Sequence, residues 1–231
     1  AWHQPWWDAS EEASWRITAH ALAAAVVDHP EAIITSRWCT GFPCEDEYLA
    51  MRQRMLGRFL YLSERSDPST WSAELMDRMV AELNAFRPVV IEANPSFLAR
   101  LSRHIVKGDR RVHSPEIIIL TYENPSLLHQ RQIREAFDAP IASSYGSTES
   151  WYVFMECEAG RLHQVTESCH VDFLPFLPEH GGPDKGRILV TTFENPWQSL
   201  LRFDIGDEVH LDGRTPCACG RREGLTLASV E

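Results

Sequence analysis

Between residues 88 and 145, short apolar runs alternate with amphipathic segments, and this alternation constrains the fold more than any other feature of the chain. The apolar runs cover 88–93, 116–122 and 140–145. The segments between them, 94–105 and 126–137, place apolar residues at helical spacing. Continuous apolar strands that alternate with amphipathic helices are typical of a parallel sheet covered on both faces. We therefore expect an α/β fold with a parallel sheet flanked by helices.

The segments on either side differ in character. Before residue 86, helical patterns run over 10–27, with Ser10 placed to cap the helix, and over 46–65 and 70–86. Five tryptophans are concentrated in residues 1–45, and we favour packing over a ring-lined ligand pocket for Trp2, Trp6, Trp7, Trp15 and Trp38. After residue 150, turns separate expected strands at 151–156, 171–174, 187–193, 200–203 and 208–211. We divide the chain into a helical, Trp-rich part (1–85), an α/β core (86–150) and a small, mainly antiparallel β subdomain (151–231).

Composition limits the classes of function. The net charge of −11 disfavours a nucleic-acid binder, which normally carries a basic surface. No apolar run approaches the roughly 20 residues of a membrane span, and no signal peptide opens the chain. Six cysteines in 231 residues are too sparse for a disulfide scaffold, so we expect a cytoplasmic protein with reduced thiols. Because the first residue is Ala rather than Met, we expect a processed or truncated chain.

Polar residues follow each of the three core strands, at 92–96, 122–124 and 145–149. The carboxyl ends of parallel strands form the usual ligand edge of such a sheet, so we expect these segments at one rim. The third of them contains Ser144, Tyr145, Gly146, Ser147, Thr148 and Glu149 in succession. A glycine beside hydroxyls and a carboxylate suits a turn around a phosphate whose oxygens share Mg²⁺ with the acid. Taken alone, the segment favours an ordinary polar turn.

A second motif, LRFDIGD at 201–207, delivers two carboxylates beside a glycine. The two oxygens of Asp207 can accept hydrogen bonds from both hydroxyls of a ribose. In isolation, this segment is also compatible with a strand that ends in a Gly-Asp turn.

The two motifs in this order, about 58 residues apart, resemble those of the adenylate-forming superfamily of acyl-CoA synthetases, adenylation domains and luciferases. That superfamily combines YGxTE with a later (Y/F)xxGD after an arginine, and this chain has YGSTE and RFDIGD. Further features resemble the phenylacetate–CoA ligase branch: the helix start Pro95-Ser96, the strand end Tyr122-Glu123, the arginine-containing helix 130–134 and the CxCGR element at 217–221. The resemblance covers residues 86–231.

The resemblance implies roles for individual residues. It makes the α/β core a nucleotide-binding domain in which Tyr145 stacks on adenine, Thr148 contacts the α-phosphate and Glu149 ligates Mg²⁺, while Asp207 of the β subdomain binds ribose. It also implies that Tyr122 and Glu123, together with Ser144, Gly146 and Ser147, lie around the nucleotide or the acyl group. The glycine-rich phosphate loop of the family is expected upstream of residue 1, since segment 34–43 matches it only at its ends. The small C-terminal domain with the catalytic lysine is expected beyond residue 231, so the chain as given is expected to be catalytically incomplete.

A second group of residues indicates a metal. Three thiolates and one imidazole, from Cys157, His163, Cys217 and Cys219, would make a closed tetrahedral zinc site of the structural kind. The branch has a Cys and a His after YGxTE and a closing CxCGR, in keeping with this set. Separate reduced thiols are the alternative, and Cys169 with His170 is a competing pair of lower rank. We do not expect Cys39 and Cys44 to be ligands, and a nucleophilic Cys–His pair ranks low.

From these motifs we expect an enzyme, an acid–thiol ligase that uses ATP and Mg²⁺ to convert a small, aryl carboxylic acid to acyl-AMP. Transfer to a thiol such as CoA then follows. The alternatives are transfer to an amine or a carrier protein, or a catalytically incomplete nucleotide-binding module. We expect no nucleic-acid or membrane partner, and a homodimer is left open. The lone histidines His104, His113, His129, His180 and His210 are expected to be surface or structural residues.

Overall fold

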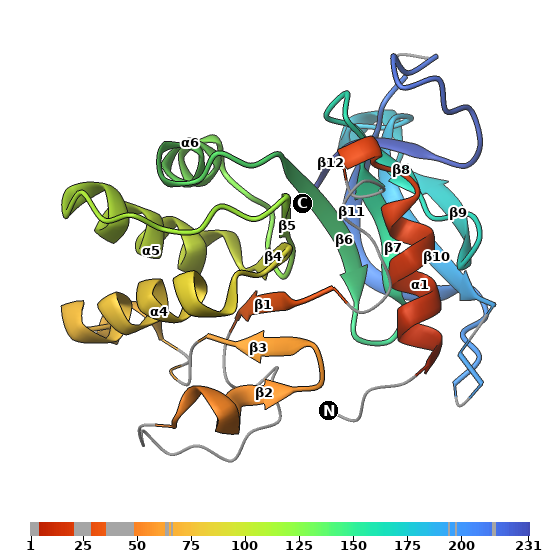
Figure 1. Ribbon diagram of the computed structural model, residues 1–231. Helices are drawn as coiled ribbons and strands as arrows, with labels where there is room; N and C mark the ends of the chain where they lie inside the picture. The colour runs from red at the N-terminus through yellow and green to blue at the C-terminus, as the bar shows by residue number, and fades with distance from the viewer. Residues whose placement is uncertain are drawn as a thin grey trace. The chain divides into compact units, whose positions relative to one another are not determined.

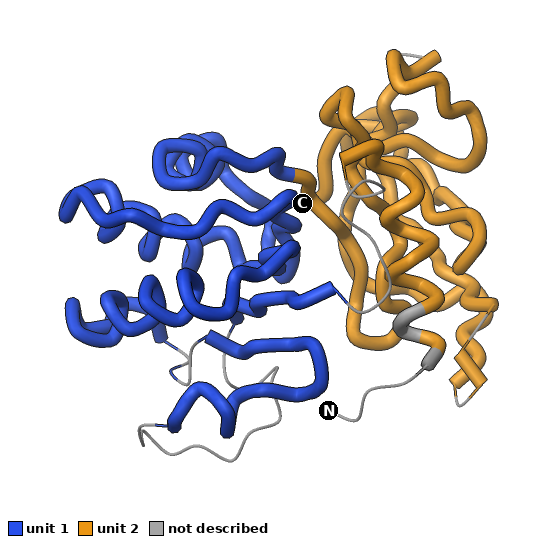
Figure 2. Tube along the Cα trace, in the orientation of Figure 1, with its two compact units in different colours: residues 1, 23–141 blue, residues 2–22, 142–231 orange. Residues whose placement is uncertain are grey.

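The computed structural model describes residues 5–20, 29–35, 49–62, 65, 67–193, 195–196, 198–213 and 216–231. The chain forms two compact units (Figure 2). Unit 1 comprises residue 1 and residues 23–141, and unit 2 comprises residues 2–22 and 142–231. These boundaries differ from the three consecutive segments expected above, because the segment around residues 5–20 packs with the C-terminal part of the chain rather than with its sequence neighbours.

Unit 1 contains a small, mostly parallel sheet. Its strands lie in the order β2–β3–β1–β4–β5, with β3, β1, β4 and β5 all parallel and β2 antiparallel to β3. Every residue of the central strands β1, β4 and β5 is buried, which explains their continuous apolar runs. The strands are β1 (Glu31–Ile34), β2 (Met55–Leu56), β3 (Phe59–Tyr61), β4 (Val90–Ala93) and β5 (Ile117–Leu120).

Three amphipathic helices accompany this sheet: α4 (Ala73–Phe86), α5 (Pro95–Lys107) and α6 (Leu127–Ala136), seen in Figure 1. Each begins at a side-chain cap, in which Ser72, Asn94 and Ser126 accept hydrogen bonds from backbone N–H groups of the first turn. Their apolar faces and the central strands share one core, which includes Met79, Leu83, Leu98, Leu101, Ile118 and Ile133. The expected α/β fold with a helix-flanked parallel sheet is confirmed.

The helical pattern over 46–65 was a wrong interpretation for the part of this segment that the structure describes. Residues Met51–Arg54 form one 3-10 turn, and the strands β2 and β3 follow it. The apolar residues of 55–62 that mimic helical spacing instead pair along the edge of the sheet, where Leu60 and Leu62 are fully buried. Pairing with β1 therefore overrides the local pattern.

Unit 2 is dominated by a curved antiparallel sheet with the strand order β6–β7–β8–β12–β11–β10–β9. Its core includes Val153, Phe154, Ile188, Val190 and Val209. The third strand of the expected parallel core, β6, pairs antiparallel with β7 in this unit. The strands are β6 (Ile141–Ser147), β7 (Trp151–Glu156), β8 (Leu162–Gln164), β9 (Cys169–Pro175), β10 (Lys185–Thr192), β11 (Phe203–Leu211) and β12 (Thr226–Val230), and the 3-10 turn Pro178–His180 precedes β10.

Of the helix expected over 10–27, residues 10–15 belong to α1 (Pro5–Trp15), which packs against β7; the helix ends at Trp15, and residues 21–27 lie outside the described residues. Ser10 is buried in the helix interior, so it is not the cap that the sequence indicated; Pro5 occupies the first helical position instead. Trp15 is 4% exposed, and Trp6 makes an edge-to-face contact with Trp151, as expected for packing tryptophans. Trp2, Trp38, Cys39 and Cys44 lie outside the described residues, as does most of segment 34–43.

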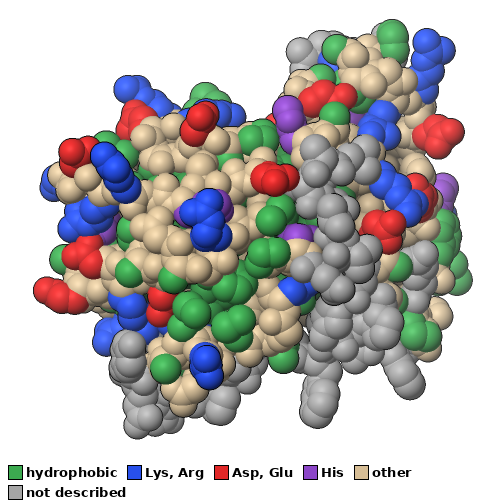
Figure 3. All heavy atoms as spheres, in the orientation of Figure 1, with side chains coloured by type: hydrophobic (Ala, Val, Ile, Leu, Met, Phe, Trp, Pro, Cys, Tyr) green, Lys and Arg blue, Asp and Glu red, His purple; other side chains and the backbone are tan. Residues whose placement is uncertain are grey.

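Among the described residues, no helix is long and apolar enough to cross a membrane. On the face shown in Figure 3, the Lys and Arg side chains of the described residues are interspersed with Asp and Glu side chains.

Candidate nucleotide site and metal centre

The YGSTE motif forms a hairpin between β6 and β7, and the turn at its tip consists of residues 148–150. Gly146 has no alternative there, because a Cβ on it would lie 1.8 Å from the carbonyl oxygen of Trp151. Trp151 has a φ of +58°, a left-handed conformation that tryptophan seldom adopts. Within the turn, Ser150 N donates to Ser147 Oγ at 3.2 Å. Residues 145–151, called the YGSTE turn below, are thus held in one specific backbone geometry.

The RFDIGD motif lies at the start of β11, where its two carboxylates have different partners. Asp204 accepts a hydrogen bond from Gly206 N at 2.9 Å and one from Arg187 Nη1 at 3.3 Å, so it shapes the strand. Gly206 has a φ of +96°, a conformation suited to glycine. Asp207 instead accepts a hydrogen bond from the phenol of Tyr145, with 2.7 Å between Oη and Oδ2.

The Tyr145–Asp207 bond joins the two motifs directly. β6 and β11 are not neighbours in the sheet, so the bond shows that the sheet of unit 2 curls until both motifs meet. Burial, reinforced by this bond and by the Asp207 charge, raises the pKa of Tyr145, which is therefore a neutral donor. Of the two carboxylates Asp204 and Asp207, it is therefore Asp207 that is hydrogen-bonded to the YGSTE turn.

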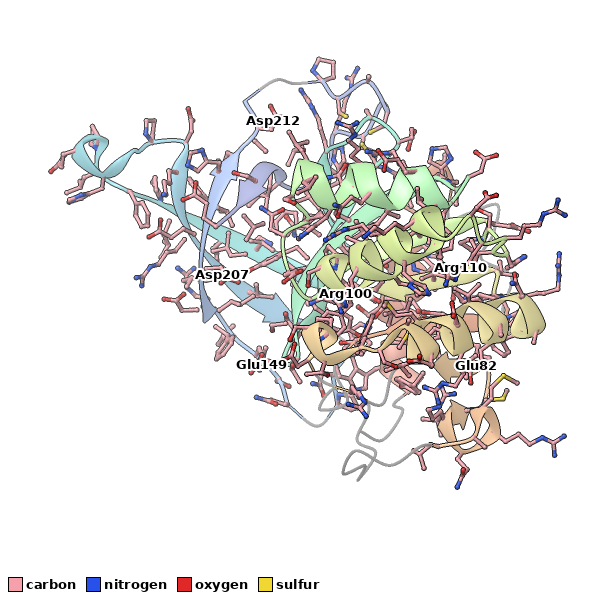
Figure 4. The ribbon with its side chains drawn as sticks, turned by 90° about the vertical axis from the view of Figure 1, so that its left-hand side faces the viewer. Glu82, Arg100, Arg110, Glu149, Asp207 and Asp212 are labelled. Carbon is pink, nitrogen blue, oxygen red and sulfur yellow. The ribbon has the colours of Figure 1, made fainter. Side chains whose placement is uncertain are left out.

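Thr148 and Glu149 are exposed at the tip of the turn. Figure 4 labels Glu149 and Asp207. It also labels Asp212, which follows the last residue of β11. An exposed hydroxyl and an exposed carboxylate on a fixed turn can contact a phosphate and its cation without a large change in fold. Ser144 is half-buried on β6, and Ser143 N donates to Glu156 Oε2 at 2.7 Å.

Tyr122 and Glu123 lie in unit 1, at the carboxyl end of β5. The Tyr122 hydroxyl donates to Glu92 Oε1 at 2.9 Å, and Glu123 Oε1 accepts from Ser96 N at 2.9 Å. These contacts bring the carboxyl ends of β4 and β5 and the N-terminus of α5 together, as the sequence predicted for two of the three segments. Tyr122 has a φ of +73° and is 49% exposed at this rim.

Sequence reasoning missed a buried cluster of charged residues in unit 1. Glu31 is 1% exposed and bonds Arg58 Nη1 at 3.0 Å, and the same nitrogen lies 2.9 Å from His29 Nε2. Burial and the neighbouring Glu92 carboxylate raise the pKa of Glu31 to about 8, although Arg58 opposes the shift. The sequence signal that could have revealed this cluster is Glu31 itself, a charged residue directly before the apolar residues of the buried strand β1.

The four residues of the expected metal centre are brought together in unit 2. Their ligand atoms, from Cys157, His163, Cys217 and Cys219, all lie within 4.8 Å of one another. Cys157 Sγ and Cys217 Sγ are 3.8 Å apart, and Cys219 Sγ is 3.4 Å from His163 Nε2. A tetrahedral zinc ion with Zn–S bonds of about 2.3 Å and Zn–N bonds of about 2.0 Å separates such ligand pairs by roughly 3.8 and 3.6 Å. The residues therefore fit a closed four-ligand site.

The orientation of His163 supports this fit. Its Nε2 faces Cys219, and its Nδ1 lies 3.3 Å from Thr226 Oγ1, so an outer hydrogen bond fixes the ring. Burial, with Arg221 and Arg161 nearby, lowers the pKa of His163 and favours the neutral ligand form. Burial raises the pKa of Cys157 to about 11, so the thiol is protonated unless a cation compensates.

The competing pair is arranged differently. Cys169 is buried in the core of unit 2 with its Sγ 3.6 Å from Val165 O, and His170 is exposed beside Asp172. Of the lone histidines, His104 bonds Asp77 at 2.7 Å, and His113 Nε2 lies 2.9 Å from Pro88 O. These contacts are structural in kind.

Comparison with known proteins gives matches in sequence and in structure. No family model matches the chain. In sequence, it is 26% identical to Protein CapK of Staphylococcus aureus over 138 residues, which cover 59% of this chain and 30% of that protein. It is 29% identical to the phenylacetate-coenzyme A ligase of Thermus thermophilus over 166 residues, 65% of this chain and 35% of that protein. The chain thus spans about a third of the length of these relatives.

In structure, the chain is similar to 2-hydroxyisobutyryl-CoA ligase. One crystal structure of that enzyme, with 2-HIB-AMP and CoA, matches with a TM-score of 0.65 and 15% identity over 96% of this chain and 46% of that one. Another, in the postadenylation state with R3-HIB-AMP, gives a TM-score of 0.63 with 14% identity, over 96% of this chain and 46% of that one. At such low identity, the likeness establishes the fold.

The chain has the fold of 2-hydroxyisobutyryl-CoA ligase, and the matches in sequence and fold together support a relationship to adenylate-forming CoA ligases. In sequence, the relationship is to Protein CapK and to a phenylacetate-coenzyme A ligase.

Proposed function

We propose that this chain is part of an enzyme that activates a carboxylic acid with ATP and transfers the acyl group to a thiol, with CoA as the first candidate. The observation that carries the proposal is the bond between Tyr145 and Asp207, which unites the YGSTE and RFDIGD motifs in unit 2. The named relatives support it, since one is a phenylacetate–CoA ligase and solved neighbours hold an acyl-AMP.

The proposed chemistry has two steps. A carboxylate oxygen of the acid attacks the α-phosphorus of ATP, and pyrophosphate leaves to give acyl-AMP. A thiol then attacks the carbonyl carbon, loses its proton, and AMP leaves. Neither step needs a nucleophile from the protein, so catalysis consists of positioning and charge neutralisation.

The residues of unit 2 are suited to these tasks. Asp207 accepts hydrogen bonds from the two ribose hydroxyls, and Tyr145, which is bonded to Asp207, presents its ring to adenine. Thr148 contacts the α-phosphate from the exposed tip of the turn, and Glu149 holds Mg²⁺. That cation, when bound, neutralises charge on the phosphates. In unit 1, Tyr122 and Glu123 would border the nucleotide or the acid, in keeping with their place at the strand ends.

We also propose that Cys157, His163, Cys217 and Cys219 hold a zinc ion. Four protein ligands leave no open position for substrate, so the ion would stabilise unit 2 without taking part in the reaction. The short Sγ–Sγ and Sγ–Nε2 separations support this role.

The test is ATP–pyrophosphate exchange by the complete protein that carries this chain. The acids to compare are phenylacetate, benzoate and 2-hydroxyisobutyrate, which cover aryl and aliphatic classes. Exchange stimulated by one acid would establish adenylation and its substrate class, and our expectation is a small aryl acid. Subsequent thioester formation with CoA, compared with transfer to hydroxylamine as an amine acceptor, would identify the acceptor.

Two other outcomes are informative. ATP binding without exchange for any acid would overturn the proposal in favour of a nucleotide-binding module without catalysis. Exchange without thioester formation would instead favour transfer to an amine or a carrier protein. The cytoplasmic location, a homodimer, and the lack of nucleic-acid or membrane partners stay predictions.

A further inference from the structure

Helix α1 lies between the two sites of unit 2. Its N-terminal end is at the YGSTE turn, where the Trp6 and Trp151 rings meet edge to face with centroids 6.4 Å apart. Its C-terminal end is at the metal centre, because Arg221, two residues after Cys219, donates from Nε to Ile17 O at 3.0 Å. Figure 1 shows α1 alongside β7, which runs from Trp151 to Glu156, the residue before Cys157.

The dimensions agree with this arrangement. The 11 residues of α1 span about 16 Å at 1.5 Å per residue. The 6 residues of β7 span about 20 Å at 3.3 Å per residue. The helix and the strand therefore run side by side from the YGSTE turn to the metal centre. β7 is continuous with both sites in the sequence, whereas α1 lies more than 100 residues before them.

Three polar links fasten the segment that follows α1 to unit 2, and two of them reach loops that carry candidate ligands. Arg221 bonds the carbonyls of both Arg16 and Ile17. Glu158, next to Cys157, accepts a hydrogen bond from Ala19 N at 3.3 Å. Arg16 Nη1 also bonds Glu167 at 2.6 Å. Carbonyls at a helix end lack intrahelical partners, so an arginine fork is an effective anchor for them.

The N-terminal end of α1 contacts Trp151, whose backbone conformation needs stabilising contacts from its surroundings. Trp151 holds a positive φ, and its carbonyl fits against Gly146 only because that residue lacks a Cβ. A bulky residue in such a conformation persists where its surroundings determine it. Packing of Trp6 on the Trp151 ring is one such determinant, and it acts on the turn that carries Thr148 and Glu149.

We propose that α1 is a rigid link through which the metal centre controls the geometry of the YGSTE turn, with Arg221 and Trp6 as positioning residues at its two ends. Metal binding orders the loop 217–221, Arg221 holds the C-terminal end of the helix, and Trp6 transmits that position to Trp151. This inference rests on the proposed zinc centre and is independent of whether the protein adenylates an acid.

Hydrogen exchange measured by mass spectrometry tests the link in the complete protein, with bound zinc quantified in parallel. In the zinc-loaded wild type, peptides covering 16–19 and 145–152 should be protected. In zinc-loaded Arg221→Gln, both should exchange roughly two- to tenfold faster, the range expected from losing an edge-to-face ring contact. Chelation of zinc from the wild type should have the same effect on both peptides. Arg222→Gln, the same change at the exposed next residue, is the matched control and should behave as wild type.

A double-variant cycle distinguishes transmission from general destabilisation. Trp6→Leu should accelerate exchange at 145–152 while zinc content and the 217–221 loop stay unchanged. In the Trp6→Leu background, Arg221→Gln should then add nothing at 145–152, because the link is already broken. Additive effects would overturn the proposal.

Further results would also overturn it. They are wild-type protection at 145–152 in zinc-loaded Arg221→Gln, chelation that loosens only 157–163 and 217–221, or a wild type that binds no zinc. If Arg221→Gln fails to retain zinc, hydrogen exchange in Trp6→Leu becomes the deciding measurement. Unchanged exchange at 145–152 in Trp6→Leu then refutes the link.

Discussion

Asp204 and Asp207 lie three residues apart on β11, yet their partners assign them different tasks. Asp204 fixes the local backbone through Gly206 N, whereas Asp207 is bonded to the tyrosine of the other motif. The motif alone shows two acids beside a glycine, and only the structure shows that their hydrogen-bond partners differ.

Substitution of these two residues is therefore expected to have unequal effects. If Asp207 binds ribose as proposed, Asp207→Ala removes a carboxylate that accepts from two ribose hydroxyls, and at ~1.5–3 kcal/mol for each bond to a charged group, ATP affinity should fall at least tenfold. Asp204→Asn keeps an oxygen for Gly206 N and should bind ATP almost as the wild type does. Isothermal titration of ATP into the complete protein measures both, and equal affinities for Asp207→Ala and wild type would refute the ribose role.

The buried Glu31 makes stability depend on pH. Its pKa in the folded protein, about 8, lies above the ordinary value of 4.5, so the folded state retains a proton that the unfolded state loses. This contribution to stability is complete below pH ~4.5 and is lost as the pH rises through ~8. Arg58 and His29 bond the Glu31 carboxylate, and Arg58 and Glu92 shift its pKa in opposite directions.

Glu31→Gln should consequently flatten the decline of stability between pH 5 and pH 8. Urea unfolding followed by tryptophan fluorescence at several pH values gives the slope for each protein. His29→Gln removes the imidazole that bonds Glu31 and should keep most of the wild-type slope. Parallel curves for wild type and Glu31→Gln would show that the carboxyl is not the source.

At the scale of elements, Arg54 connects the edge strands of unit 1 to a helix. Its guanidinium is 1% exposed and donates to Leu49 O at 3.1 Å and to Tyr61 O at 2.6 Å. It also pairs with Glu82 on α4, which Figure 4 labels. One buried side chain therefore joins the 3-10 turn, β3 and α4.

Arg54→Met should lower the free energy of unfolding by about 3–5 kcal/mol, because it leaves the Glu82 carboxylate buried without its main partner. Adding Glu82→Leu should recover part of that loss. Arg103→Met, an exposed arginine on α5, should change stability by less than ~0.5 kcal/mol. Urea denaturation compares the four proteins, and a loss in Arg54→Met no larger than in Arg103→Met would contradict the connecting role.

At the scale of the whole molecule, the two compact units should respond differently to loss of metal. Cys217→Ser should remove zinc and destabilise unit 2 while unit 1 is unaffected. With free zinc at a thousandfold above its dissociation constant, bound metal adds ~4 kcal/mol, which corresponds to a melting temperature ~8–16 °C higher.

Scanning calorimetry together with metal analysis measures this difference. Cys169→Ala alters a buried thiol outside the cluster and should keep full metal content. If the wild type contains no zinc, or if Cys217→Ser melts at the wild-type temperature, the centre has no structural role.

The sequence predicted the parts of the fold whose signals are local. Strands β4, β5 and β7 and helices α5 and α6 appear within a few residues of their expected positions, because each combines an apolar period with a clear start or stop. Strands of two or three residues, such as β2, β3 and β8, carry no period and are defined only by pairing. They could not be recognised from the chain alone.

The same distinction applies to the sites. The types and spacing of Cys157, His163, Cys217 and Cys219 were enough to group them before their ligand atoms were seen to converge. The Tyr145–Asp207 bond, by contrast, spans 62 residues and depends on how the sheet of unit 2 curls. The boundaries of the units were likewise hidden, because α1 joins strands that lie more than 100 residues later.

The division of unit 2 into residues 2–22 and 142–231 has a consequence for synthesis on the ribosome. Residues 23–141 form a continuous stretch and can fold once they have left the exit tunnel. The first helix emerges earlier, yet the sheet that receives it is translated more than 100 residues later, and Cys217 and Cys219 follow about 200 residues after the helix. At about 5–20 residues per second, that helix waits several seconds or longer for its binding surface. During this interval its apolar face is open to chaperones.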